Sequence, residues 1–159
     1  MYIVSDSSPL IIFAKIGKIE LLLQALGEIR IPQAVYNEIV IQGQGKPGDI
    51  ELKNTVWIRK EPIKDYVKIH QLPEGLGLGE KEAILLAQEI GAILLVDDKL
   101  ARREAQSRGI ICVGSLRVLK EAKEKGLIAK IKPLGDELRK KGIRIKDSLY
   151  QEFIKAMGE

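Results

Sequence analysis

Hydrophobic residues recur along the chain in two alternating patterns. Short apolar runs bounded by glycine, proline or charged residues predict β-strands, and segments with apolar residues every three or four positions predict amphipathic helices. The strands are expected at residues 2–5, 28–31, 56–58, 92–96 and 110–113. The helices are expected at residues 9–14, 19–26, 33–41, 49–53, 79–90, 99–107, 116–125, 131–141 and 148–156. Apolar strands separated by helices favour an α/β fold, a three-layer α/β/α sandwich with a central, mostly parallel sheet of about five strands.

Carboxylates and hydroxyls follow two of the expected strands at the point where each strand ends. Asp6, Ser7 and Ser8 come directly after the first strand, and Asp97 and Asp98 follow the most apolar one. Ligands of open parallel sheets bind at the carboxyl ends of the strands. These side chains are therefore candidates for one acidic pocket.

Three glutamates on the expected helices could complete this pocket. Glu38 lies between Val35 and Ile39, which mark the buried stripe of its helix, so it falls at the edge of the core-facing side. Glu80 and Glu82 both lie near the edge of the apolar face of a later helix, and a rotation of about 100° per residue does not decide between them. We therefore expect at least one of these two acids in the pocket.

The composition is that of a globular domain of 159 residues, of which 45% are hydrophobic and 30% charged. This balance excludes a disordered chain, and no apolar run is long enough for a membrane span or a signal peptide. One cysteine, Cys112, and one histidine, His70, cannot build a zinc site. A metal would be held by carboxylate oxygens and would be Mg²⁺ or Mn²⁺. The lone cysteine favours a reducing, cytoplasmic setting, and the many Ile, Lys and Glu residues favour a thermophilic host.

The net charge of +4 is unevenly distributed. Residues 117–159 hold twelve Lys or Arg against seven Asp or Glu, and the excess is densest between Lys130 and Lys146. A basic surface of this kind can meet the phosphate backbone of a nucleic acid.

Two other classes of phosphate-binding domain fit the sequence less well. The glycines between Gly75 and Gly79 do not form the G-x-G-x-x-G fingerprint of a dinucleotide-binding domain, and they follow a polar loop rather than a strand. A phosphate-accepting signalling domain would carry its acid pair after the first strand, whereas here the pair Asp97-Asp98 follows a later one.

Four segments combine strand or helix residues with the candidate acids: residues 3–10 (IVSDSSPL), 31–39 (IPQAVYNEI), 76–84 (LGLGEKEAI) and 94–98 (LLVDD). In this order they resemble the PIN domain, a metal-dependent nuclease fold of a VapC-like prokaryotic ribonuclease superfamily. The resemblance covers residues 1–116, which would form the PIN-like catalytic core. Residues 117–159 resemble the C-terminal helical tail of one branch of that superfamily, and are expected to pack on the core or on a dimer partner.

The resemblance implies an acidic site that binds one or two Mg²⁺ or Mn²⁺ ions. A glutamate at position 80 or 82 departs from the aspartate that most members carry there, and Asp97 stands where many members have Thr or Ser. The implied set is Asp6, Glu38, Glu80 or Glu82, and Asp98 as catalytic and metal-binding acids, Asp97 as a further ligand, and Ser7 or Ser8 as the group that orients Asp6.

The activity that the resemblance implies is endoribonuclease cleavage, with RNA rather than DNA as substrate. A small antitoxin protein and a second copy of the chain are the implied partners, if the protein is the toxin of a toxin–antitoxin pair. A carboxylate-bound cation lowers the pKa of a bound water, so this chemistry needs no His or Lys base. Arg102 and Arg103 are expected to offset the repulsion between the acids and a phosphate. The alternative is a non-catalytic RNA-binding or protein-interaction module on the same fold.

Overall fold

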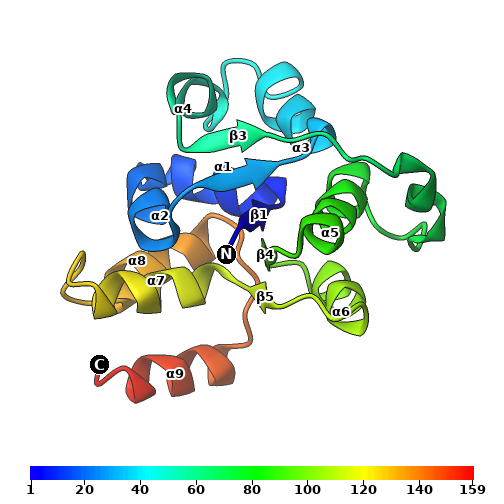
Figure 1. The fold of residues 1–159 in the computed structure, drawn as a ribbon. Helices are drawn as coiled ribbons and strands as arrows, with labels where there is room; N and C mark the ends of the chain where they lie inside the picture. Colours follow the sequence, from blue (N-terminus) through cyan, green and yellow to red (C-terminus); the bar gives the residue numbers. More distant parts are fainter.

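Five short parallel strands form the centre of the protein, seen in a computed structural model that describes residues 1–159 (Figure 1). The five-stranded sheet with helices on both faces confirms the expected α/β/α sandwich. Because all strands run the same way, their carboxyl ends lie along one edge of the sheet. In spatial order the strands are β3 (Ile58–Lys60), β2 (Ile29–Ile31), β1 (Ile3–Ser5), β4 (Ile93–Leu95) and β5 (Cys112–Val113).

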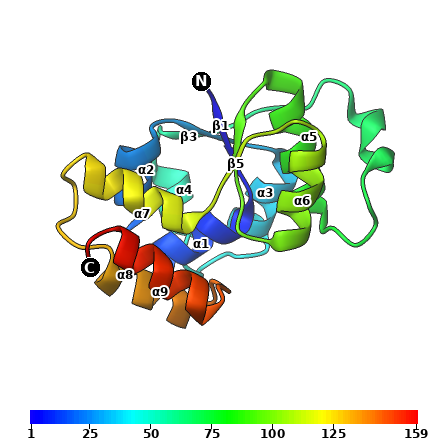
Figure 2. The same ribbon diagram turned by 90° about the horizontal axis from the view of Figure 1, so that it is seen from below.

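Side chains that alternate along the strands feed two hydrophobic clusters, one on each face of the sheet. Ile3 and Leu95 belong to the larger cluster of 24 buried residues, and Val4 and Leu94 to the smaller cluster of 15. The larger cluster lies under α1 (Ser7–Lys15), α2 (Ile19–Leu26), α4 (Asp49–Asn54), α7 (Ser115–Glu124), α8 (Lys132–Lys140) and α9 (Asp147–Ala156). The smaller lies under α5 (Leu78–Ile90), α6 (Lys99–Ser107) and the 3₁₀-helix η2 (Tyr66–Gln71) (Figure 2). The chain passes from β2 to α4 through α3 (Gln33–Tyr36) and the π-helical stretch η1 (Asn37–Ile41), which also contribute to the larger cluster.

One strand lies two residues further along the chain than its pattern predicts. The sequence places it at residues 56–58, but β3 spans Ile58–Lys60 and pairs with β2 through Ile29 opposite Ile58. Val56 and Trp57 are exposed, and only Ile58 of the strand is buried. At the edge of a sheet, hydrogen bonding to the neighbouring strand fixes the ends of a strand more strongly than hydrophobicity does.

The helical tail packs on the core. Tyr150 is fully buried, and Ile154 at 3% exposure lies in the larger cluster with it. Of the other apolar residues expected to face the core or a second subunit, Phe153 and Met157 pack against this cluster, whereas Leu149 is exposed. No helix of the structure is both long enough and apolar enough to span a membrane.

Candidate active site

Asp6 lies directly after β1, where the chain turns from the sheet into α1. It is only 4% exposed, and this burial raises the pKa of its carboxyl from 3.8 to about 7. A hydrogen bond from the Ser7 backbone N–H opposes the rise in pKa. The negative charges of Glu80, Glu38 and Asp98 add to it. Asp6 is therefore the most buried member of a group of four acids that repel one another.

Glu38 reaches this group from the π-helical stretch η1. The wider turn is seen in the hydrogen bond from the Gln42 backbone N–H to the Asn37 carbonyl, at 2.8 Å, and such turns often occur at functional sites. The Glu38 carboxylate accepts hydrogen bonds from the Ser7 hydroxyl and, at 3.1 Å, from the Gly79 backbone N–H. Glu38 is thus held between the first turns of α1 and α5.

Glu80 and Asp98 complete the group from the starts of α5 and α6. Glu80 accepts a hydrogen bond from the Gly77 backbone N–H at 2.9 Å, and Asp98 caps α6 by accepting one from the Ala101 N–H at 2.9 Å. Burial raises the pKa of Glu80 against the effect of Gly77. The charge of Asp98 and a hydrogen bond between the two carboxyls raise it further, as does the charge of Glu38. The repulsion among these carboxylates opposes the ionisation of Glu80 in the absence of a cation.

Glu82 does not join the acid group. Its buried carboxylate accepts hydrogen bonds from the Ala34 backbone N–H at 3.0 Å and from the Tyr66 hydroxyl at 2.5 Å. These bonds tie α5 to α3 and to η2, and they satisfy a carboxylate that would be costly to bury alone. Glu82 also lines a separate cavity of about 380 Å³, together with Lys60. Of the two glutamates that the sequence leaves equivalent, Glu80 is the one that meets the other acids.

Asp97 connects β4 to α7 rather than facing the acid group. Its Oδ1 accepts a hydrogen bond from the Ser115 backbone N–H at 2.8 Å, and its Oδ2 accepts one from the Ser115 hydroxyl at 2.5 Å. Burial raises the pKa of Asp97, and the bonds from Ser115 and the charge of Arg102 oppose the rise. Arg102 donates to the Val96 carbonyl at 3.0 Å, so it reinforces the end of the same strand.

The remaining expected residues lie around the acid group without forming part of it. The Ser7 hydroxyl donates to Glu38, so it orients that acid instead of Asp6. Ser8 in the first turn of α1 and Arg103 on α6 are exposed.

Two glycines that the sequence analysis does not single out shape the site. A Cβ at Gly79 would lie 2.7 Å from Oε2 of Glu38, and one at Gly114 would lie 3.0 Å from Oδ1 of Asp97. The sequence signal for the first is a glycine inside a helical turn, where it costs about 1 kcal/mol relative to alanine. Ser115 is also missed, although a serine at the start of an expected helix is typical of a residue that satisfies free backbone groups there.

The acid group has the donor chemistry of a site for a hard divalent cation. Its carboxylates come from four places in the chain, and such oxygens are the ligands that Mg²⁺ and Mn²⁺ prefer. As the side chains stand, no three His, Cys, Asp or Glu residues form a set that could hold a metal ion. The carboxylates instead accept hydrogen bonds from N–H and O–H groups. A cation would replace some of these bonds, and the repulsion among the acids favours that exchange.

Comparison with known proteins gives the family of this chain. A family model described as a PIN domain matches residues 2–159, the helical tail included. A solved PilT N-terminus domain protein from the hyperthermophilic archaeon Sulfolobus solfataricus has a similar fold, with a TM-score of 0.56 and 19% identity over 77% of this chain and 93% of that one. A domain of a functionally unknown protein from Methanocaldococcus jannaschii gives a TM-score of 0.49 and 22% identity, over 71% of this chain and 89% of that one. No curated protein matches the chain. The match of the family model over nearly the whole sequence shows that the chain belongs to the PIN-domain family.

Proposed function

We propose that this protein is a metal-dependent nuclease that hydrolyses phosphodiester bonds in RNA. The PIN-domain family has a nuclease-type fold, which supports the general class of activity. The observation that carries the proposal is the convergence of Asp6, Glu38, Glu80 and Asp98 at the carboxyl ends of β1 and β4.

The four acids together would supply the ligands of the metal ion in this proposal. Asp6 and Asp98 would hold Mg²⁺ or Mn²⁺, with Glu38 and Glu80 completing the set of oxygen ligands. A bound ion of this kind polarises a phosphoryl oxygen and lowers the pKa of a water molecule. The backbone N–H groups of Gly77 and Gly79 orient the two glutamates, which keeps their carboxylates pointed at the other acids.

A role as the toxin of a toxin–antitoxin pair is the finer proposal. It is supported by the resemblance of residues 1–116 to small prokaryotic PIN proteins, and it implies a small antitoxin partner and a homodimer. Arrest of bacterial growth on expression of the wild type, but not of Asp6→Asn, is the result that this role requires.

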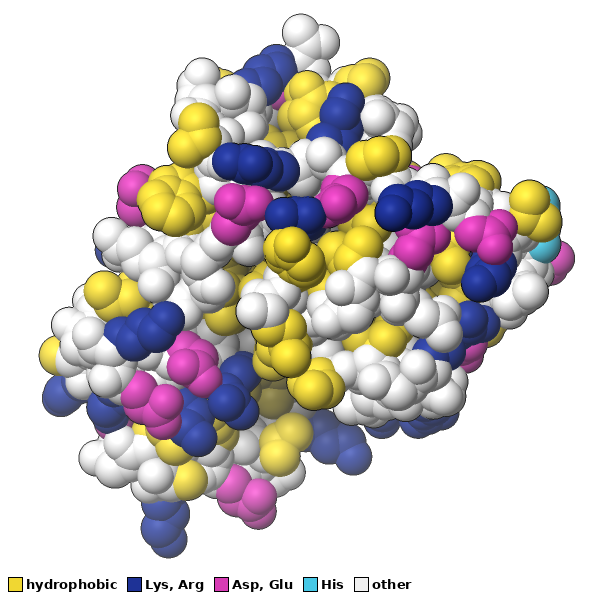
Figure 3. Space-filling model, viewed as in Figure 1, with side chains coloured by type: hydrophobic (Ala, Val, Ile, Leu, Met, Phe, Trp, Pro, Cys, Tyr) yellow, Lys and Arg dark blue, Asp and Glu magenta, His cyan; other side chains and the backbone are white.

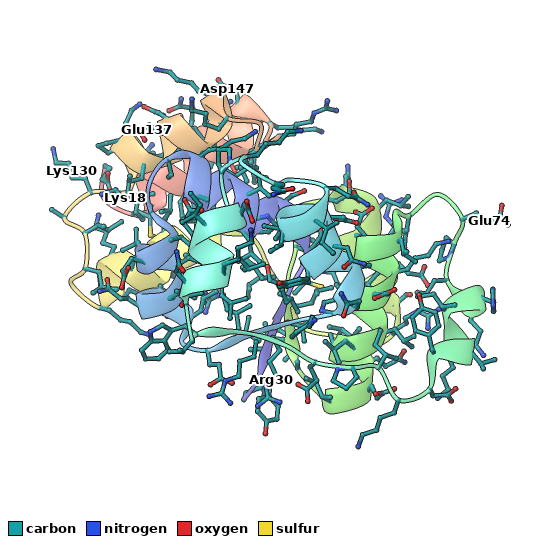
Figure 4. All side chains as sticks on the ribbon, turned by 90° about the horizontal axis from the view of Figure 1, so that it is seen from above. Lys18, Arg30, Glu74, Lys130, Glu137 and Asp147 are labelled. Atoms are coloured by element: carbon teal, nitrogen blue, oxygen red, sulfur yellow. The ribbon has the colours of Figure 1, made fainter.

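Cleavage of labelled single-stranded RNA and DNA in Mg²⁺, Mn²⁺ or EDTA tests the nuclease activity. Asp6→Asn and Glu80→Gln should each lower the rate by about 100-fold or more, since loss of a group that only supports a metal ligand already costs about 10–100-fold. Glu74→Gln is the matched control, because it removes the same kind of charge at an exposed glutamate that is not one of the four acids. Glu74 lies on the loop before α5, and this loop is also remote from α8 and α9 (Figure 4). The control variant should cleave at the rate of the wild type.

Two results would contradict the proposal in different ways. Full metal-dependent cleavage by both variants would remove the acid group from the reaction. RNA binding without cleavage under any metal would favour the non-catalytic module.

A further inference from the structure

A groove with basic walls is formed by the end of α8 and the segment that joins α8 to α9. Its volume is about 640 Å³, and Ile143, which is 6% exposed, anchors its floor in the hydrophobic core. The floor is therefore fixed relative to the rest of the molecule. The lining residues are Arg139, Lys140, Ile143, Arg144, Ile145 and Lys146.

Four of the eight basic residues on the tail outside this groove are paired with a nearby carboxylate. Such pairs are the ordinary arrangement on a solvated helix surface, where they add little to stability. They are Arg117–Glu121, Lys120–Glu124, Lys123–Glu159 and Lys132–Asp136.

Three of the four cations of the groove have no such partner, and they lie together. Arg139 is 3.4 Å from Asp147, but Lys140, Arg144 and Lys146 have no Asp or Glu oxygen within 4.0 Å. Like charges gathered without counter-charges raise the free energy of the free protein and attract an anion. The face drawn in Figure 3 is different, because basic and acidic side chains are interspersed across it.

The groove and the acid group carry opposite charge. Figure 2 shows α8 and α9 on the side of the sheet that α1 covers, and residues of α1, α8 and α9 share the larger hydrophobic cluster. The acid group repels a polyanion, and the basic groove attracts one. The two features therefore complement each other on a single bound strand.

We propose that this groove binds the phosphate backbone of the RNA strand on which the acid group acts, an inference that rests on the proposed nuclease function. Lys140, Arg144 and Lys146, three cations without a carboxylate partner, suit several phosphates of one strand better than one phosphate ion. The half-buried Ile145 and the Ile143 floor give a sugar or a base an apolar surface to lie on.

Fluorescence anisotropy of a labelled single-stranded RNA, with EDTA present to prevent cleavage, tests the proposal. The test protein carries Lys140→Gln, Arg144→Gln and Lys146→Gln. The control carries Lys15→Gln, Lys18→Gln and Lys130→Gln, which remove the same charge from exposed residues without ion pairs. Figure 4 shows Lys18 and Lys130 at the end of the tail away from Asp147. Circular dichroism and thermal unfolding establish that both proteins fold.

The groove variant should bind the RNA about tenfold more weakly or worse. The slope of log affinity against log salt concentration should fall in magnitude by about 2, because each phosphate contact on a single strand contributes about 0.7. The control should lose less than about twofold, since none of its three charges lines the groove.

Several results would overturn the inference. These are equal losses in the two variants, an unchanged affinity in the groove variant, or full competition for the site by millimolar inorganic phosphate. Vesicles containing phosphatidylserine that bind as tightly as RNA, and lose binding in the groove variant, would assign the site to a lipid surface. Cleavage that survives Asp6→Asn would instead refute the nuclease site and leave the binding result standing.

Discussion

At the level of single residues, the main chain orients the acids as much as their own side chains do. Glu38, Glu80 and Asp98 each accept a hydrogen bond from the backbone N–H of a helix's first turn or cap. These helix starts carry partial positive charge, which favours a carboxylate there. The position of each acid therefore depends on how closely the backbone can approach it, and at Gly79 only glycine allows the approach.

Gly79→Ala should displace the Glu38 carboxylate, because the new Cβ would lie 2.7 Å from Oε2. We expect Mn²⁺ binding to weaken by about tenfold or more, as it does when a supporting group is lost. The free energy of unfolding should fall by about 1–2 kcal/mol from overpacking, although alanine favours a helix. Calorimetric Mn²⁺ titration and urea unfolding measure the two effects.

The Glu38→Ala background provides the control for this substitution. With the carboxylate gone the overlap is removed, and Gly79→Ala should stabilise the protein by about 0.5–1 kcal/mol. Destabilisation in that background would show that the helix backbone, rather than Glu38, requires the glycine.

At the level of elements, hydrophobic periodicity predicts the kind and order of nearly every strand and helix. Tertiary contacts decide the features that this periodicity does not determine. The π-helical turn at Asn37–Ile41 has no sequence signature, because it depends on packing between α3, α5 and the core. Whether Glu80 or Glu82 joins the acid group depends on the positions of Ala34 and Tyr66, which bind Glu82. A helical projection of α5 gives no information on the positions of residues in other elements. The acids at the strand ends are predictable because parallel strands bring their carboxyl ends together.

The start of α8 depends on Glu159, and we expect Glu159→Gln to weaken it. The carboxylate accepts hydrogen bonds from the Ile131 and Lys132 backbone N–H groups and from Lys123 Nζ, the last at 2.7 Å, and its side chain is 7% exposed. Losing these charge-assisted bonds should lower the free energy of unfolding at neutral pH by about 2 kcal/mol. Glu152→Gln, at an exposed position on α9, should change it by less than about 0.5 kcal/mol.

The pH dependence of this effect has a definite sign. Burial raises the pKa of Glu159, but the hydrogen bonds and charge around it outweigh burial and lower the pKa to about 2. The stabilisation is therefore complete above the ordinary value of 4.5 and is lost as the pH falls towards 2. Urea unfolding at neutral pH and near pH 3 should show the difference between wild type and Glu159→Gln shrinking. A constant difference would contradict this account.

At the level of the whole molecule, two hydrophobic clusters and a continuous sheet support a group of acids that opposes folding. Strand residues belong to both clusters, so the packed sheet holds in place the ends of β1 and β4, after which Asp6 and Asp98 lie. The tail adds to the larger cluster, which also fixes the floor of its basic groove. The molecule as a whole thus tolerates a local electrostatic cost that a cation would relieve.

This cost predicts that the metal-free protein loses stability as the pH rises. The unfolded chain ionises Asp6 near 3.8, whereas the folded protein retains its proton up to about 7. The free energy of unfolding should therefore fall between these values by about 1.4 kcal/mol per pH unit, or about 3 kcal/mol between pH 5 and 7.5. Asp6→Asn lacks this contribution and should become more stable than wild type over that range. Urea unfolding in EDTA at the two pH values measures it.

Mn²⁺ should reverse the effect in the wild type, because it binds the ionised carboxylates. We expect the unfolding midpoint at pH 7.5 to rise with Mn²⁺ in the wild type and to stay unchanged in Asp6→Asn. Parallel stability curves for the two proteins in EDTA would show that the Asp6 pKa is not raised.

A change in the π-helical turn would alter the acid group and leave the rest of the fold intact. The π-helical turn contains one residue more than an α-helix uses for the same turn, and Glu38 lies within it. Deleting Asn37 would restore the regular helix and leave the strands and the core sequence intact, yet it would turn the Glu38 side chain by about 100°. Under the proposed function, a protein that lost this one residue would keep the fold and the basic groove, with one of its four acids turned away from the others. It would bind RNA without cleaving it.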